Sequence, residues 1–286
     1  IKDCTIESFE YGIFLDDVSG NGVMAGNKII NNILRDNETG IYNNDSNGNI
    51  FTDNIVVDGV YGIEIQGSEG HILTDNTVQN NSGDAIYIND TDSSTLTRNS
   101  VVENDYGIYI EGSNNTLMEN TASRNESGIY MSGDSNTLTG NTAKSNLYAG
   151  IYVNNSDDNS FTGNVAASNG REGIVLRYSD GNTLEGNTFN SNSLNGIRIE
   201  ESSYITLTDN TVNSNMLSGI YVEDSLSTGI TLMYNSASKN GEYGFYDSDP
   251  YNIYDENTCR KNGIAGYYTE DSVLMCTPQP GEEADP

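Results

Sequence analysis

Residues 150–172 read GIYVNNSDDNSFTGNVAASNGRE, and the same pattern restarts at Gly173. A small residue followed by an aliphatic or aromatic one returns roughly every 22 residues along the chain. The small residues of this series are Gly12, Gly40, Gly62, Ala85, Gly107, Gly128, Gly150, Gly173, Gly196, Gly219, Gly244 and Gly266. A fixed period of this length is typical of a solenoid, in which each repeat packs on the next one.

Within each repeat the apolar residues alternate with polar ones, as in Ile151-Tyr152-Val153, which is the period of a strand. A second series lies in phase with the first and consists of Asn27, Asn54, Asn76, Asn99, Asn120, Asn141, Asn164, Asn187, Asn210, Asn235 and Asn257. Asn tolerates the left-handed backbone region and can hydrogen-bond from repeat to repeat, so we expect these residues at bends. The Gly before each aliphatic residue indicates a positive φ or a close approach of the backbone.

Three short strands and their turns account for one repeat. The sequence therefore predicts an all-β fold, a single-stranded parallel β-helix of about 12 coils with a period of about 22 residues. We expect the β-helix to cover residues 1–275 and a Pro-rich, acidic tail to cover residues 276–286.

The repeat resembles that of NosD-like proteins. The resemblance is carried by Gly150-Ile151-Tyr152-Val153, by Asn159-Ser160-Phe161-Thr162-Gly163-Asn164 and by Asn169. It implies a right-handed coil and membership of the wider group of carbohydrate-binding and sugar-hydrolysing β-helices. The copper role attached to that family name finds no support, because six Met and one His form no cluster in the sequence.

The chain carries 42 acidic and 12 basic residues, a formal net charge of −30. This charge argues against nucleic acid and anionic membranes as partners, and no apolar run is long enough to span a membrane. The first residue is not Met and already lies inside a repeat, so we expect a processed or excerpted mature protein at the cell surface or outside the cell.

Acidic residues recur four and five positions after the repeated Gly. No cofactor is required by any motif, but carboxylates on neighbouring coils lie close enough to share Ca²⁺. The candidate metal ligands are Asp16, Asp17, Glu200, Glu201, Glu223, Asp224, Glu270 and Asp271. The alternative interpretation is a solvated acidic face that salt screens.

The residue two positions after the repeated Gly points outward and is most often Tyr. Four consecutive coils carry it, at Tyr87, Tyr109, Tyr130 and Tyr152, and this stripe is a candidate surface for carbohydrate or a protein partner. The alternative is stacking of Tyr between coils without any ligand.

The three cysteines differ in position. Cys259 falls in an inward slot and Cys276 follows about one coil later, so a disulfide between them is geometrically plausible. Cys4 falls in an outward slot, equivalent to Thr121, at the other end of the repeat array, and is a candidate for an intermolecular disulfide or a free thiol.

Sequons for N-glycosylation predict a glycoprotein, although a chain this rich in Asn, Ser and Thr also contains such triplets by chance. The candidate sites are Asn37, Asn44, Asn80, Asn89, Asn114, Asn125 and Asn154.

Catalytic motifs are weak. Residues 243–250 (YGFYDSDP) resemble the Tyr-Gly-Phe-Asp-Pro-His motif of alginate epimerases, but Asp247 is displaced by one position and no His follows Pro250. His71 is about eight coils away, and Arg177 or Arg198 remains as a lone candidate base. We therefore predict no catalytic residues and no enzyme activity.

We expect a self-assembling, non-catalytic structural β-helix, because neither end shows a capping unit and exposed strand ends pair with other chains. It would join copies of itself end to end into a filament or surface layer. The alternatives are a carbohydrate-binding module that uses the Tyr stripe and, ranked below it, a polysaccharide lyase or epimerase.

Overall fold

The computed structural model describes residues 1–16, 26–223, 226–247, 249, 251–268 and 276. These residues form strands, bends and turns, and none of them is helical. The predicted all-β parallel solenoid is confirmed, with about 11 turns instead of 12 and a period of about 22 residues. None of the described residues belongs to a helix that could cross a membrane.

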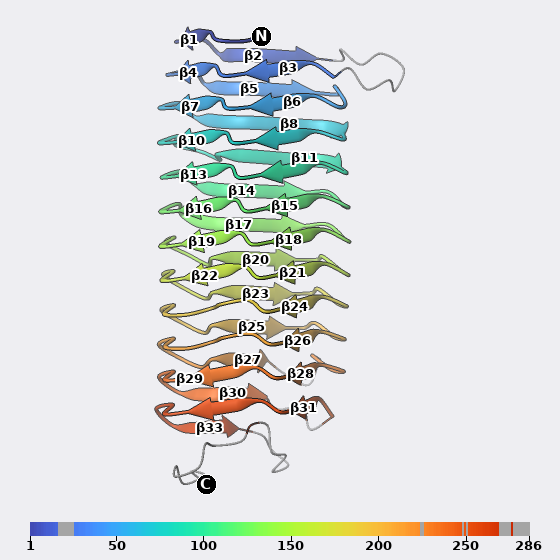
Figure 1. Cartoon of the computed structure of the whole chain (residues 1–286), viewed down its shortest axis with the longest axis vertical. Coiled ribbons are helices and arrows are strands. Elements are labelled where there is room, and N and C mark those ends of the chain that lie inside the picture. Colours follow the sequence, from blue (N-terminus) through green and yellow to red (C-terminus); the bar gives the residue numbers. More distant parts are fainter. Residues whose placement is uncertain (17–25, 224–225, 248, 250, 269–275, 277–286) are drawn as a thin grey trace. The chain divides into compact units, whose positions relative to one another are not determined.

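The chain divides into two compact units, Ile1–Thr142 and Ala143–Pro286. The strands of successive turns form three parallel arrays, which we call the long-strand sheet, the second sheet and the third sheet (Figure 1).

In the first unit the long-strand sheet consists of β2 (Tyr11–Asp16), β5 (Thr39–Asn44), β8 (Tyr61–Glu69), β11 (Ile86–Asp92), β14 (Tyr106–Glu111) and β17 (Ser127–Ser132). The second sheet consists of β3 (Lys28–Ile30), β6 (Ile50–Thr52), β9 (Ile72–Thr74), β12 (Thr95–Thr97), β15 (Thr116–Met118) and β18 (Thr137–Thr139). The third sheet consists of β1 (Thr5–Glu7), β4 (Ile33–Arg35), β7 (Ile55–Val57), β10 (Thr77–Gln79), β13 (Ser100–Val102) and β16 (Thr121–Ser123). The strand β19 (Thr142–Lys144) contains the boundary between the units.

In the second unit the long-strand sheet consists of β20 (Ile151–Asn154), β23 (Ile174–Arg177), β25 (Ile197–Glu200), β27 (Ile220–Glu223), β30 (Tyr243–Asp247) and β33 (Ala265–Tyr268). The second sheet consists of β21 (Ser160–Thr162), β24 (Thr183–Glu185), β26 (Thr206–Thr208), β28 (Thr231–Met233) and β31 (Ile253–Asp255). The third sheet is formed by β22 (Val165–Ala167), β29 (Ser236–Ser238) and β32 (Thr258–Arg260), with single bridges at Thr188 and Thr211 between β22 and β29.

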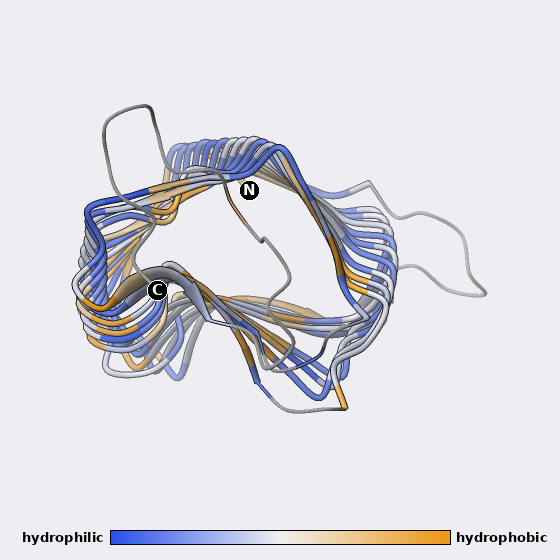
Figure 2. Ribbon diagram, turned by 90° about the horizontal axis from the view of Figure 1, so that it is seen from below, coloured by the Kyte–Doolittle hydropathy of each residue, from blue (hydrophilic) through white to orange (hydrophobic). Residues whose placement is uncertain are grey.

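Inward-facing residues of successive turns stack on one another and form the core. Ile86, Ile108 and Ile129 occupy one such column and are all fully buried. Figure 2 shows hydrophobic residues recurring at the same places in successive turns. Each buried aliphatic side chain contributes roughly 1.5–3 kcal/mol, so the repeat is stabilised chiefly by contact with its neighbours.

Buried asparagines form ladders at the bends. The Oδ1 atom of Asn99 accepts hydrogen bonds from the backbone N–H and the side-chain amide of Asn76, at 3.0 and 2.9 Å. Its Nδ2 atom donates to the Leu73 carbonyl at 2.9 Å and to Asn120 Oδ1 at 2.9 Å. Each amide thus satisfies backbone groups that the bend leaves unpaired.

The first coil differs from the sequence prediction. Asn32, not Asn27, precedes Asn54 in its ladder, whereas Asn27 bonds to Asn49 in another ladder. The backbone with positive φ belongs to the residue before each ladder Asn, such as Asp75 (φ 56°) and Arg98 (φ 52°), and not to the Asn itself. The shift arises because the first repeat is longer than the others, with Gly40 28 positions after Gly12, so that two Asn residues of this repeat fit the spacing.

Candidate functional site

Charged and aromatic side chains meet on the outward face of the long-strand sheet in the second unit. Register places Val175 opposite Arg198, and Arg198 opposite Tyr221. Two residues further along each strand, Arg177 lies opposite Glu200, which lies opposite Glu223. Because side chains alternate along a strand and neighbouring strands are about 4.8 Å apart, these groups share one face.

The Arg198 guanidinium lies among three carboxylates. Its Nη1 atom is 3.8 Å from Glu172 Oε1, its Nη2 atom is 3.4 Å from Glu200 Oε2, and its Nε atom donates to Glu223 Oε2 at 2.8 Å. Glu172 comes from the bend before β23 and is only 4% exposed. Burial opposes the positive charge, but the hydrogen bond and the charge of Glu223, followed by those of Glu200 and Glu172, raise the pKa of Arg198.

Arg177 connects this group to tyrosine hydroxyls. Its Nε atom is 3.2 Å from Glu200 Oε1, an ion-pair distance at which the N–H is poorly directed for a hydrogen bond. Its Nη2 atom donates to the Tyr178 hydroxyl at 3.3 Å, and its guanidinium carbon lies 4.8 Å from the centre of that ring. Hydrogen bonds to the hydroxyls of Tyr152 and Tyr178 raise the pKa of Arg177.

We call Glu172, Arg177, Arg198, Glu200 and Glu223 the Arg198 cluster. Its guanidinium groups can hold a carboxylate, its own carboxylates can accept a proton, and the tyrosine hydroxyls beside it can donate one. The sequence singled out both arginines. It missed Glu172. The signal in the sequence is an acidic residue directly before the small residue of the repeat, since Glu172 precedes Gly173 as Asp84 precedes Ala85 in the first unit.

The predicted Tyr stripe is present but packs against itself. In the first unit the rings of Tyr109 and Tyr130 stack with their centres 4.5 Å apart, and Tyr87 lies 5.0 Å from Tyr109. The edge of Tyr106 covers both stacked rings. These side chains are half-buried, and burial raises the pKa of Tyr109. Tyr152, the fourth member, belongs to the second unit.

Two of the cysteines are joined. Cys259 and Cys276 form a disulfide with their Cα atoms 5.8 Å apart, and Cys259 occupies the inward column of Ala237. Cys4 is exposed with a free thiol, but it lies one position earlier than predicted. Thr5, not Cys4, is in the column of Thr121, and Cys4 takes the ladder position that precedes Asn32.

Two of the predicted metal ligands form ion pairs with an arginine. Glu200 and Glu223 pair with Arg198, and Glu201 lies at a bend with a φ of 46°. Over the described parts of the chain, no three His, Cys, Asp or Glu side chains come together in a way that would hold a metal ion. Asp16 is described and exposed, whereas the candidates Asp17, Asp224, Glu270 and Asp271 lie outside the described residues.

The epimerase-like motif is built into the core. Asp247 takes the inward position that Val222 holds in the preceding turn and is 1% exposed. Its carboxylate accepts hydrogen bonds from Asn252 Nδ2 at 2.7 Å and from the Tyr254 hydroxyl. Burial raises the pKa of Asp247, and a polymer chain cannot reach it.

The sequons divide into two groups. Asn37 and Asn125 are buried ladder residues, so the folded chain leaves no room for a glycan at either. The remaining candidates are exposed or half-buried and stay predictions, namely Asn44, Asn80, Asn89, Asn114 and Asn154.

The comparisons with known proteins agree with this architecture. A family model described as a right-handed β-helix region matches residues 1–143 and 106–266. This confirms the handedness that we had taken from a resemblance alone. No curated protein matches the chain.

Several solved structures share the fold. The periplasmic alginate epimerase AlgG is 19% identical, with a TM-score of 0.67 over 96% of this chain and 75% of that one. The A-module of the Azotobacter vinelandii mannuronan C-5 epimerase AlgE4 is 14% identical, with a TM-score of 0.60 over 96% and 90%. The Dettilon tailspike protein is 13% identical, with a TM-score of 0.54 over 92% and 57%.

Two of these three structures are epimerases of alginate or mannuronan, that is, enzymes of polysaccharides. This finding contradicts both the predicted non-catalytic, structural role and the prediction that the chain is not an enzyme. End-to-end assembly into a filament likewise has no support among these structures. At such low identities the likeness establishes the fold, and any activity of this chain has to be argued from its own residues.

Proposed function

Because the chain belongs to the family of right-handed β-helix proteins, we propose that it is an enzyme acting on an acidic polysaccharide. The reaction we propose is that of a lyase or epimerase, and the proposed site is the Arg198 cluster. The observation that carries the proposal is the meeting of two guanidinium groups, three carboxylates and two tyrosine hydroxyls along the outward face of the long-strand sheet and the bends at either end of β23.

Lyases and epimerases of uronate sugars need a cation, a base and an acid at the reacting carbon. Removing the proton on the carbon next to a carboxylate needs a cation to hold that carboxylate and a base to take the proton. An epimerase then returns a proton to the opposite face of the carbon, whereas a lyase expels the glycosidic oxygen. We assign carboxylate binding to Arg177 and Arg198, proton removal to Glu200 or Glu223, and proton delivery to Tyr178 or Tyr152.

The structures that this chain resembles support the substrate class. Two of them are named as epimerases of alginate or mannuronan, and one of these is periplasmic. We therefore also propose a periplasmic or extracellular location and a polysaccharide partner. The finer resemblance to NosD-like proteins stays part of this proposal and assigns no further residue.

A second candidate function is carbohydrate binding without turnover. The stacked rings of Tyr87, Tyr109 and Tyr130 in the first unit support it, because sugar rings pack on aromatic faces. The rings are half-buried against one another, so they offer edges and hydroxyl groups more than open faces. We rank this function below the enzymatic one.

The test is to incubate the protein with polymannuronate, polyguluronate and pectate. Proton NMR of the polymer reports epimerisation, and ultraviolet absorbance reports the unsaturated ends that a lyase produces. We expect Arg198→Gln and Glu223→Gln to lower the rate by at least about 100-fold, the usual contribution of a positioned acid, base or charge.

The matched control is Arg98→Gln, which removes an exposed arginine paired with Asp75 at 2.8 Å in the first unit. It removes one charge and one ion pair and should leave the rate unchanged. Thermal unfolding of each variant separates loss of activity from loss of fold. Absence of turnover on all three polymers, or turnover that survives Arg198→Gln, would refute the proposal.

A further inference from the structure

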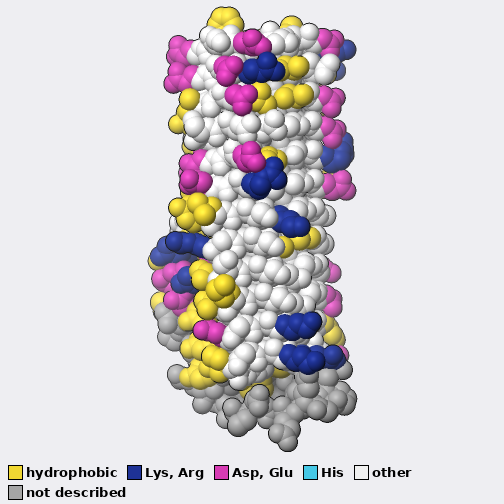
Figure 3. Space-filling view, turned by 90° about the vertical axis from the view of Figure 1, so that its left-hand side faces the viewer, with side chains coloured by type: hydrophobic (Ala, Val, Ile, Leu, Met, Phe, Trp, Pro, Cys, Tyr) yellow, Lys and Arg dark blue, Asp and Glu magenta, His cyan; other side chains and the backbone are white. Residues whose placement is uncertain are grey.

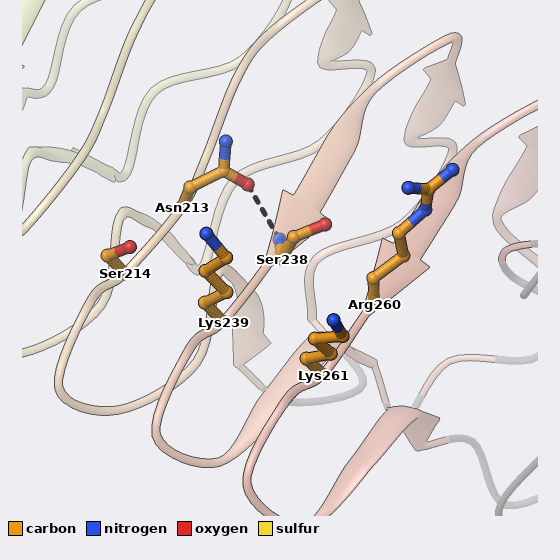
Figure 4. A pocket seen from close by; sticks show the side chains of 6 residues that line it. All are labelled: Asn213, Ser214, Ser238, Lys239, Arg260 and Lys261. Carbon is orange, nitrogen blue, oxygen red and sulfur yellow. Dashed lines mark hydrogen bonds between the residues drawn. The ribbon is translucent and has the colours of Figure 1, made fainter. Parts of the chain in front are cut away.

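A second feature of the second unit is an open pocket of about 550 Å³ beside the third sheet. Its lining residues are Asn213, Ser214, Ser238, Lys239, Arg260 and Lys261 (Figure 4). Three of the 12 basic residues of the chain line this one pocket, in a molecule with 42 acidic residues. Such a concentration of positive charge is opposite to the charge of the molecule as a whole.

The repeat brings these side chains together. Ser238 at the end of β29 lies opposite Arg260 at the end of β32, and Lys239 and Lys261 follow at the same bend of successive turns. The backbone N–H of Lys239 donates to the Arg260 carbonyl at 2.8 Å. Both lysines have a positive φ, 58° and 53°, and their side chains extend in the same direction in Figure 4.

These three charges have no protein counter-ion within the described residues. None of their charged nitrogens lies within 4.0 Å of a described carboxylate. Five arginines of the chain do have one, namely Arg35, Arg98, Arg124, Arg177 and Arg198. Holding three like charges together costs free energy unless an anion neutralises them.

Neutral hydrogen-bond groups complete the pocket. Asn213 Oδ1 accepts the backbone N–H of Ser238 at 2.7 Å, which directs the Asn213 amide nitrogen away from this bond (Figure 4). Within the described residues that amide nitrogen and the hydroxyls of Ser214 and Ser238 make no hydrogen bond. The pocket therefore combines cationic side chains that lack a described counter-ion with hydrogen-bond donors that lack a described acceptor. Groups of both kinds bind the oxygen atoms of an anion. Figure 3 shows Lys and Arg in small groups on a face whose side chains are mostly uncharged.

We infer that this pocket is an anion-binding subsite that takes carboxylate groups of an acidic polysaccharide. The ligand class rests on the proposed function, whereas the positive charge of the pocket does not. A polymer with one carboxylate on each sugar places anions at regular intervals, and successive turns place Lys239 and Lys261 about 4.8 Å apart along the stack. The subsite would hold the polymer without taking part in the reaction.

The experiment measures binding of polymannuronate to the full chain by isothermal titration calorimetry, with dextran as a neutral polymer and sodium phosphate as a small anion. Binding should weaken strongly between about 0.05 M and about 1 M salt, because screening acts over about 10 Å at 0.1 M and about 3 Å at 1 M. We expect the triple variant Lys239→Gln, Arg260→Gln, Lys261→Gln to weaken binding of the polymer on the order of tenfold or more.

The matched control is Lys144→Gln. Lys144 ends β19, as Arg260 ends β32, and is exposed in the same unit but outside the pocket. It should leave the affinity unchanged. All substituted residues are exposed, and the thermal unfolding midpoint checks that the fold is retained.

The outcomes separate this inference from the proposed function. Equal affinity in the triple variant and the unaltered chain, equal binding of dextran, or binding of phosphate without polymannuronate would each overturn the subsite. Salt-sensitive binding that is lost in the triple variant would support it even if no turnover is found. Loss of turnover in Arg198→Gln alone, with unchanged affinity in the triple variant, would leave the enzyme proposal standing and remove the subsite.

Discussion

His71 is the single histidine of the chain, and it is fully buried. It takes the place of an asparagine in a ladder, where Nδ1 accepts the backbone N–H of Asn49 at 3.2 Å and Nε2 lies 2.9 Å from Ser68 Oγ. This geometry requires the neutral ring with its proton on Nε2. Burial lowers the pKa of His71 from 6.5 to about 4.

The shift predicts a pH-dependent stability. Between pH 6.5 and 4 the unfolded chain binds a proton that the folded chain does not, so the stability contributed by His71 is present above 6.5 and lost as the pH falls toward 4. The full effect is about 3 kcal/mol, since one pKa unit corresponds to about 1.4 kcal/mol. Urea denaturation at pH 7 and pH 4.5 should show a loss in the unaltered chain that His71→Asn lacks.

Asp84 supplies the opposing control. Burial raises the pKa of Asp84 from 3.8 to about 6, so its contribution to stability falls as the pH rises through this window. Asp84→Asn should therefore steepen the loss on acidification by about 1 kcal/mol, a value discounted for partial exposure. An identical pH dependence in the unaltered chain and His71→Asn would contradict the assignment.

For single residues the sequence predicted only part of what the structure shows. It indicated that His71 is too far from residues 243–250 to act with them, but it could not show the ring replacing a ladder amide, because the two side chains share only their hydrogen-bonding capacity. It also placed Cys4 one residue away from its true column. Such errors arise because alternation along a strand reverses with a shift of one position.

At the scale of the repeated element, the small residue before each aliphatic one is explained by close approach. A Cβ atom added at Gly107 would lie 2.6 Å from the Gly128 carbonyl oxygen and 2.7 Å from Asn125 Nδ2. The φ of Gly107 is not positive, so of the two reasons that the sequence left open the steric one holds. At Gly107 the next turn therefore leaves no room for a Cβ atom.

We therefore expect Gly107→Ala to destabilise the chain by about 1–3 kcal/mol, the usual cost of overpacking a tight site. The equivalent position in the preceding turn already carries Ala85, so Ala85→Gly is the matched control and should cost less than about 1 kcal/mol. Urea denaturation measures both. A Gly107→Ala variant as stable as the unaltered chain would show that the neighbouring turn moves aside easily.

The strands could be predicted because the same alternation of inward and outward residues recurs in every turn. The bends were predictable in composition but not in detail. The sequence indicated that Asn belongs there, whereas only the structure separates the inward ladder amide of Asn76 from the left-handed residue Asp75 before it. The charged pairs on the outward face could not be predicted, since they depend on which long side chains reach across neighbouring turns.

At the scale of the whole molecule, the net charge of −30 is the dominant property. Like charges repel more in the compact chain than in the unfolded one, so added salt should stabilise the fold. We expect a gain on the order of 1 kcal/mol between about 0.05 M and about 0.5 M NaCl, a range over which the Debye length falls severalfold. Thermal unfolding at each salt concentration measures it.

CaCl₂ at equal ionic strength is the informative comparison. Equal stabilisation by the two salts would mean simple screening, in agreement with the finding that no three described His, Cys, Asp or Glu side chains are arranged to hold a metal ion. Stabilisation by CaCl₂ beyond that of NaCl would instead require a cation site, and the candidates for it that lie outside the described residues are Asp17, Asp224, Glu270 and Asp271. No effect of either salt would contradict the repulsion argument.

Function was the least predictable level. The fold supports many activities, and the sequence motif closest to an epimerase turned out to hold a buried Asp247 inside the core. The groups suited to catalysis come from four successive turns and from the bends beside β23, so no contiguous motif contains them. Arg198 could be noticed in the sequence as an interruption of the Tyr series, but its pairing with Glu172, Glu200 and Glu223 could not.

Because the asparagine ladders are uniform, they do not determine which turn packs on which during folding. A turn that docked on the wrong neighbour, one repeat too early or too late, would still find an amide at each bend and an aliphatic residue in each column. The correct neighbour is distinguished by contacts that occur in one turn only. Examples are the hydrogen bond from Asn49 to His71 and the disulfide between Cys259 and Cys276. These irregular contacts fix the register of the turns. We therefore expect that a chain in which all of them are replaced by the usual residues of the repeat could pair its turns in more than one register.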